Sequence, residues 1–272
     1  MKKIAIIPVL FATLTGCAQQ KTMDFEKYDP VSTLVVPEHP VTRAKFPFID
    51  VHNHQFSMPT MDLSTLTSEM DKLNMAVMVN LSGDNGNNLS RAVENVRTHY
   101  PKRFIVFANV DFDRVGDPGW AEKAAKQLEE DVRNGANGLK IYKDLGFSVK
   151  DVDGKRVAVD DPRLSPIWEM AGKLGIPVLI HTADPLMFWA PMDEHNERWL
   201  ELATHPGRKR GPNDPEPFQD LLNEQHRMFA AHPATTFIAA HFGWYPNDLG
   251  HLGKLLDSLP NVNVEFGAVI AE

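Results

Sequence analysis

The sequence has 272 residues, of which 43% are hydrophobic, 24% charged and 9% aromatic, a balance that excludes a mainly disordered chain and indicates a globular protein with a sizeable core. The net charge is −8, and no basic stripe is long enough to follow a phosphate backbone, so we expect no nucleic-acid partner. A single cysteine excludes an intramolecular disulfide framework and a cysteine-rich metal site.

The first sixteen residues have the pattern of a secretory signal. Lys2 and Lys3 form a positive region, residues 4–14 are apolar but too few to span a membrane, and small residues precede Cys17. Residues 14–17, Leu-Thr-Gly-Cys, resemble the bacterial lipobox, in which cleavage precedes the cysteine and the cysteine is acylated. The alternative, a buried N-terminal strand with Cys17 as a small hydrophobic residue, leaves the lysine pair unexplained.

This resemblance implies a lipoprotein outside the cytoplasm. Residues 1–16 would be removed, and the mature chain would be held at a membrane by a lipid on Cys17 while the domain stays in water. Ala18 stands where an aspartate would favour the inner membrane, so we expect the outer membrane, with the protein facing the periplasm. We predict that residues 17–45 form a tether and that residues 46–272 form one domain.

Short apolar runs then alternate with helical patterns. The runs are continuous, as in buried parallel strands, and cover residues 48–51, 76–81, 104–110, 138–142, 177–181, 236–241 and 262–266. Helices are predicted near residues 64–73, 88–99, 118–134, 162–174, 217–232 and 247–259. In the third of these, Asp117 can cap the helix and Gly135 can end it. The alternation predicts an α/β fold, either a β/α barrel or a doubly wound sheet.

Two features favour the (β/α)8 barrel of the TIM type. The first strand is not followed by the Gly-x-Gly-x-x-Gly pattern of dinucleotide-binding sheets. In addition, polar residues gather at the carboxyl ends of several strands, where barrel enzymes build their sites.

Histidines are the clearest of these polar residues. Asp50, His52 and His54 lie at the end of the first strand and share one side of it, so the two imidazoles can reach one cation. Two solvated loop histidines would also explain this pair alone. His181 ends the fifth run and His241 the sixth, however, where packing alone would favour Val or Leu. Four histidines at one rim indicate a metal site.

The sequence resembles the amidohydrolase superfamily, in particular its amidohydrolase-2 branch. The resemblance lies in Phe-Ile-Asp-Val-His-Asn-His at 48–54, Gly-Leu-Lys-Ile-Tyr at 138–142, Pro-Val-Leu-Ile-His at 177–181 and Phe-Ile-Ala-Ala-His-Phe-Gly-Trp at 237–244. It implies that His52, His54 and His181 bind a divalent cation. Zinc is the first candidate, although imidazoles also suit Mn, Fe, Co and Ni. The resemblance implies that His241 is the catalytic residue that positions or deprotonates the attacking water, as in mononuclear members, or else binds a second metal, as in binuclear ones.

Lys140 has three possible roles. In binuclear relatives a lysine of the fourth strand is carbamylated and bridges two metals; alternatively Lys140 contacts the substrate, or it extends to solvent. We assign Lys140 as a substrate contact, together with Trp244, which follows His241. The long segment 182–215 is expected to be a lid or binding wall, or else a surface excursion.

The resemblance also implies an aspartate at the end of an eighth strand, which this sequence does not contain before its last residue, Glu272. We therefore expect a barrel truncated after the seventh strand, a fragment of a longer protein. Less favoured alternatives are that residues 33–36 fill the gap or that another chain does. Glu265 and Asp184 are possible substitutes for the aspartate, but neither is favoured, because Glu265 belongs to another strand and Asp184 lies beyond the histidine rim.

Three functions follow from these observations. The first is a hydrolase in which metal-activated water attacks a C–N or C–O bond of a small carbonyl substrate. The second is a metal-dependent decarboxylase of the same fold. The third is a catalytically inactive envelope lipoprotein, which the missing carboxylate would imply if the chain truly ends at residue 272.

Overall fold

The computed structural model describes residues 39–211, 214 and 217–269. Contacts divide the chain into residues 1–39 and 40–272, and the second unit is described here. The predicted signal peptide, Cys17 and most of the predicted tether lie outside the described residues. In the part that the structure describes, no helix has the length and apolar character needed to cross a membrane.

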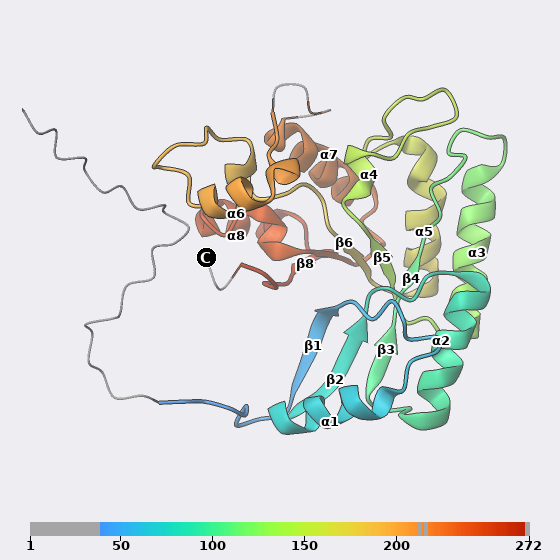
Figure 1. The fold of residues 1–272 in the computed structure, drawn as a ribbon. Helices are drawn as coiled ribbons and strands as arrows, with labels where there is room; N and C mark the ends of the chain where they lie inside the picture. The colour runs from blue at the N-terminus through green and yellow to red at the C-terminus, as the bar shows by residue number, and fades with distance from the viewer. Residues whose placement is uncertain (1–38, 212–213, 215–216, 270–272) are drawn as a thin grey trace, which may run out of the picture. The chain divides into compact units, whose positions relative to one another are not determined.

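Eight short strands form two parallel sheets in the described residues (Figure 1). The strands are β1 (Phe48–Asn53), β2 (Met75–Asn80), β3 (Phe104–Val106), β4 (Ala108–Asn109), β5 (Leu139–Ile141), β6 (Val178–Ile180), β7 (Phe237–Ala239) and β8 (Val262–Val264). Their order is β1-β2-β3 in one sheet and β4-β5-β6-β7-β8 in the other. Every pair is parallel, so the predicted α/β fold with parallel strands is confirmed.

The third predicted strand is divided at Phe107. The backbone N–H of Phe107 donates to the carbonyl of Asn80 in β2 at 2.9 Å, whereas the next N–H, that of Ala108, donates to the carbonyl of Gly138 beside β5 at 2.8 Å. Consecutive residues therefore bond to opposite neighbours, and one apolar run becomes β3 and β4, which link the two sheets.

Helices follow most of the strands. They are α1 (Leu63–Leu73), α2 (Gly86–His99), α3 (Trp120–Asn134), α4 (Asp144–Phe147), α5 (Ser165–Leu174), α6 (Trp199–Thr204), α7 (Phe218–Ala231) and α8 (Leu249–Ser258), with 3-10 turns η2 (Pro162–Leu164), η3 (Leu186–Phe188), η4 (Pro206–Arg208) and η5 (His241–Trp244). Gly135 ends α3 with φ +119°, as predicted. Asp117 does not cap this helix, because Gly119 holds the cap position and the Asp117 carboxylate pairs with Arg114.

The core lies along the central strands. Leu139, Ile141 and Val178 are each 0% exposed, as expected of strands covered on both faces. The sheets end at β1 and β8, and no described strand pairs with the outer edge of either, so the barrel is not closed among the described residues. Ile49 and Val51 in β1 are 55% and 42% exposed.

Candidate metal centre

Four histidine rings lie together at the carboxyl ends of β1, β6 and β7. The ring centroids of His52 and His54 are 5.2 Å apart. The His241 ring stacks on that of His52 at 5.0 Å, and the His181 ring lies edge-on to that of His241 at 4.5 Å. The structure thus brings together all four histidines that the sequence pattern singled out.

Two of these rings are oriented by acceptors at Nδ1. His52 Nδ1 lies 2.8 Å from Glu265 Oε1, and His241 Nδ1 lies 2.6 Å from the backbone oxygen of Gly267. Because an ionised carboxylate and a carbonyl only accept, both rings donate from Nδ1, and the neutral form of each ring has its lone pair on Nε2. Neither Nε2 atom has a hydrogen-bond partner among the described residues.

The other two rings are held neutral by their surroundings. Burial, followed by the charge of His52, lowers the pKa of His54 to about 4. Burial also lowers the pKa of His181 well below its ordinary value, with His241 as the next cause. The Nε2 atom of His181 is buried without a partner among the described residues. Neutral imidazole is the form that binds metals, so both rings are ready to act as ligands at neutral pH.

Glu265, which follows β8, is central to the cluster. Its Oε1 also accepts from the backbone N–H of His241 at 2.9 Å, and its Oε2 accepts from that of Gly267 at 2.5 Å. Burial opposes ionisation of this carboxyl, but the hydrogen bonds from His52 and from these N–H groups outweigh it and hold the pKa of Glu265 at about 2. The site therefore contains a fixed negative charge.

The structure and the sequence argument select different ligand sets. The possible ligand atoms of His52, His241 and Glu265 lie within 4.8 Å of one another and form a group that could hold a metal ion. Sequence reasoning set Glu265 aside because it belongs to another strand. The sequence feature that could have identified Glu265 is its position at the end of an apolar run, on the same rim as the histidines. His54 and His181 lie outside this group of three but contact its rings.

The backbone around His241 is strained. His241, Phe242 and Trp244 have φ values of +58°, +55° and +61°, and Gly243 between them has φ +57°. Residues other than glycine rarely adopt this left-handed backbone region, and those that do cluster where function requires a fixed geometry. The turn ends β7 two residues before the predicted strand end and directs the His241 ring toward His52.

The two predicted substrate contacts lie close to the rings. Lys140 in β5 is 1% exposed; among the described residues its Nζ has no hydrogen-bond partner, and it lies 5.7 Å from the centroid of the Tyr142 ring. Burial lowers its pKa to about 7, although Glu265 opposes this shift. The Trp244 ring lies 4.8 Å from that of His241, and its buried Nε1 has no partner in the described part of the chain. Both side chains thus have free donors next to the histidine cluster.

A pocket of about 280 Å³ opens beside the cluster. Its lining residues are Lys143, His181, Asp184, Pro185, Phe188, Arg198, Glu201, Arg208, His241, Trp244 and Ala268. Asp184, the second carboxylate considered from the sequence, is 3% exposed and lies 2.5 Å from both Lys143 Nζ and Arg210 Nη2. Its charge is therefore already balanced by two cations.

The long segment after β6 forms one wall of this pocket. Phe188, Arg198 and Arg208 line it together with the histidines, whereas Trp189 turns away and packs against Phe218 of α7 at 5.5 Å. The segment therefore contributes both a wall of the pocket and aromatic packing against an outer helix, the two roles that the sequence left open.

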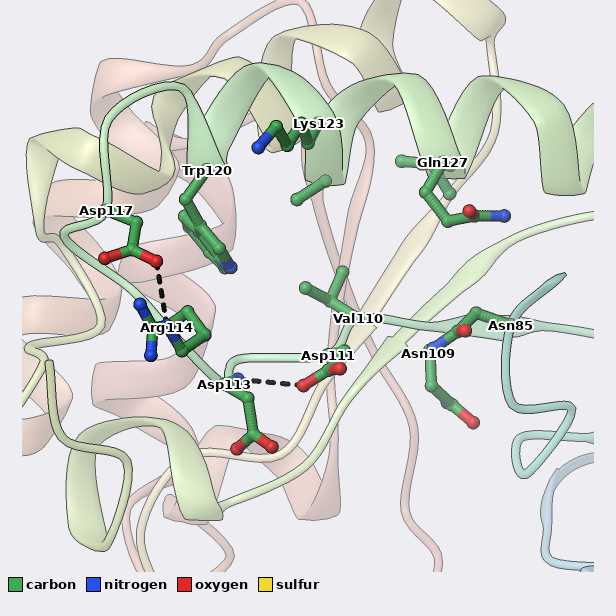
Figure 2. Close-up of a pocket in the computed structure, with 12 residues that line it drawn as sticks. Asn85, Asn109, Val110, Asp111, Asp113, Arg114, Asp117, Trp120, Lys123 and Gln127 are labelled. Atoms are coloured by element: carbon green, nitrogen blue, oxygen red, sulfur yellow. Dashed lines mark hydrogen bonds and ion pairs between the residues drawn. The ribbon is translucent and has the colours of Figure 1, made fainter. Parts of the chain in front are cut away.

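A separate pocket of about 370 Å³ lies along one side of α3 (Figure 2). In Figure 2 its labelled side chains include Asp111, Arg114 and Trp120. None of the residues that line it belongs to the histidine cluster, so this pocket is not part of the candidate metal centre.

Comparisons with known proteins found a family model and similar solved structures. The model of the amidohydrolase family matches residues 44–272. Similar solved structures include an uncharacterized TIM-barrel protein from Bordetella bronchiseptica (17% identity, 75% of this chain and 58% of that chain covered, TM-score 0.46) and a 2,6-dihydroxybenzoate decarboxylase (19% identity, 77% and 70% covered, TM-score 0.49). Another is a 4-oxalomesaconate hydratase from Rhodopseudomonas palustris (16% identity, 78% and 69% covered, TM-score 0.46). This chain thus spans 58% of the length of the Bordetella protein. No curated protein matches the sequence.

Proposed function

Because this chain belongs to the amidohydrolase family, we propose that it is a metal-dependent hydrolase that attacks a C–N or C–O bond of a small carbonyl substrate. We assign His52, His54 and His181 as ligands of a divalent cation, with zinc as the first candidate. The supporting observation is the buried, unpartnered Nε2 of His181 beside rings whose Nδ1 atoms are already occupied. A buried polar atom without a partner is costly, and a cation would remove that cost.

A divalent cation bound there would supply Lewis-acid chemistry toward water and a carbonyl oxygen. The chain's own groups would move the proton and hold the substrate. His241 donates from Nδ1 to Gly267, so its Nε2 can accept a proton from the attacking water. Trp244 Nε1 and Lys140 Nζ, both free donors next to the rings, can hold the substrate oxygen. Glu265 keeps the His52 ring in place and contributes negative charge.

Metal content tests the ligand assignment. After dialysis against Zn²⁺ and removal of excess metal, the wild type should retain zinc, whereas His52→Ala and His181→Ala should bind it at least about 100-fold more weakly, because each loses a ligand. His99→Ala is the matched control, since His99 is an exposed residue of α2. Equal zinc content in all four proteins would refute the site.

The same samples separate the role of His241 and the type of reaction. His241→Ala should retain zinc and lose turnover of a panel of small lactones, esters and amides; loss of zinc as well would make His241 a ligand. Release of CO₂ from aromatic or enoic acids, without hydrolysis of the panel, would instead identify a decarboxylase.

We also propose that the protein is an outer-membrane lipoprotein anchored through Cys17. The basis is the sequence of residues 1–17 alone. Cells given a labelled fatty acid should label the wild type and leave Cys17→Ala unlabelled, with the label in the outer-membrane fraction. Equal labelling of both proteins would contradict the anchor.

A further inference from the structure

The His54 ring is held by a series of hydrogen bonds through Ser82 and Tyr142, two residues to which the proposed function gives no role. His54 Nδ1 lies 2.8 Å from Ser82 Oγ, and Ser82 Oγ lies 2.7 Å from Tyr142 Oη. Tyr142 Oη lies 3.2 Å from the backbone oxygen of Leu81. These residues follow β1, β2 and β5, so the hydrogen bonds link two strands of the first sheet to one strand of the second at the rim of the site.

The direction of each hydrogen bond follows from the last acceptor in the series, the carbonyl of Leu81. The Leu81 carbonyl only accepts, so Tyr142 donates its single hydroxyl proton to it. The Tyr142 oxygen must then accept from Ser82, which uses the only proton of that hydroxyl. Ser82 Oγ is therefore an acceptor toward His54, and the His54 ring must donate from Nδ1. This leaves the lone pair of neutral His54 on Nε2.

Ser82, the middle residue of this hydrogen-bond series, is buried and fixed in position. Ser82 is 5% exposed, and its backbone N–H donates to Asn80 Oδ1 at 3.0 Å. The same oxygen accepts from the backbone N–H of Gln55 at 2.8 Å, and Asn80 itself is 0% exposed. One buried amide thus holds both the residue after His54 and the serine that bonds to it. The relative position of the ring and its acceptor is set by the fold.

We propose that Ser82 and Tyr142 are positioning residues that hold His54 as its Nδ1–H tautomer and so present Nε2 to the cation. The inference rests on the proposed function for the identity of the ligand, a divalent cation. The tautomer itself is a property of the metal-free protein and is measured separately. Partners of this kind typically account for about 10–100-fold in metal affinity.

The first experiment is ¹⁵N NMR of the histidine rings in metal-free protein, with the His54 signals assigned by their loss in His54→Gln. In the wild type, His54 should show a protonated Nδ1 and an unprotonated Nε2. Ser82→Ala should lose this preference because the acceptor is gone, Ser82→Thr should keep it, and Tyr142→Phe should weaken it because the serine proton is freed. An Nε2–H form in the wild type, or an unchanged spectrum in Ser82→Ala, would overturn the proposal.

The second experiment measures Zn²⁺ affinity by competition with a chelating dye, after thermal unfolding has shown which variants are folded. Ser82→Ala should bind about 10–100-fold more weakly than the wild type, with Ser82→Thr restoring most of the affinity. Ser90→Ala is the matched control, because Ser90 Oγ also makes one short hydrogen bond, to the Gly86 carbonyl at 3.0 Å in α2.

The two experiments distinguish the two proposals. Wild-type affinity in a folded Ser82→Ala overturns the positioning role and leaves the metal site intact. A wild type that shows the expected tautomer but binds no cation overturns the proposed function, and the role of Ser82 and Tyr142 in metal binding falls with it.

Discussion

Gly138→Ala should lower the free energy of unfolding by about 3 kcal/mol, the upper end of the usual cost of overpacking a core. A Cβ atom at Gly138 would lie only 2.3–2.5 Å from three atoms of the Phe107 ring. Phe107 is 6% exposed and packs against Val79, Leu81 and Leu179, so its ring has little room to move. Gly138 does not have a positive φ, so the effect comes from this contact alone. Urea unfolding measures it.

The control for this substitution is Gly253→Ala. Gly253 lies in α8 with nothing within 4 Å of its Cβ position, so alanine there should raise stability by about 0.5–1 kcal/mol. The double variant Phe107→Leu with Gly138→Ala should recover part of the loss, because a smaller side chain gives way. If Gly138→Ala is as stable as Gly253→Ala, the close contact between Gly138 and the Phe107 ring is wrong.

Lys140→Met should stabilise the metal-free protein while removing a proposed substrate contact. Lys140 is 1% exposed, and among the described residues its amine has no hydrogen-bond partner and only a distant contact with the face of the Tyr142 ring at 5.7 Å, so folding requires this amine to lose either its water or its proton. Burial lowers its pKa from 10.5 to about 7. At about 1.4 kcal/mol per unit, the cost at neutral pH is on the order of 4 kcal/mol, and methionine removes it.

The pH dependence of this gain has a defined sign. Above pH 10.5 the amine is neutral in both the folded and the unfolded chain, so lysine carries no ionisation penalty there. As the pH falls from 10.5 toward 7, the unfolded chain binds a proton that the folded protein does not, and the penalty grows. Below pH 7 it stays constant. The difference in unfolding free energy between Lys140→Met and the wild type should therefore be largest at pH 7 and below.

Urea unfolding at intervals from pH 6 to pH 10 tests this expectation in chelator-treated protein. Lys126→Met serves as the control for the lost charge, because the Lys126 side chain is 74% exposed and pairs only loosely with Glu130 at 3.8 Å. A gain for Lys140→Met that does not change with pH would show that packing, rather than ionisation, is responsible.

The strands and the histidine rim could be predicted because both depend on local pattern. Continuous apolar runs produce strands buried on both faces, and parallel strands place their carboxyl ends at one rim. His181 and His241 interrupt the apolar pattern at the ends of two runs, and this signal is visible in a single sequence without an alignment. The family resemblance added roles to these residues, and those roles remain predictions.

Glu265 could not be weighed correctly from the sequence, because its importance depends on distance in space. The argument treated it as a residue of the wrong strand, yet its carboxylate bonds to His52 in β1 and to the backbone of His241 after β7. The same holds for Ser82, whose partners His54 and Tyr142 come from two other segments. Contacts between segments far apart in the sequence leave no periodic signal.

Backbone features were also beyond the sequence pattern. The division at Phe107 follows from the direction of two consecutive N–H groups, which an apolar run does not specify. The left-handed turn at residues 241–244 places aromatic and imidazole side chains where composition would favour Gly or Asn.

That turn has a consequence for engineering. Selection for heat resistance should favour Asn or Gly at Phe242, which is only partly buried, since these residues relieve its positive φ at little steric cost; Trp244 is 7% exposed, and its loss would leave a cavity. The relaxed loop would no longer hold the His241 imidazole against its neighbours. Variants of this protein that are selected for thermal stability alone would therefore tend to lose the His241 geometry on which the proposed catalysis depends.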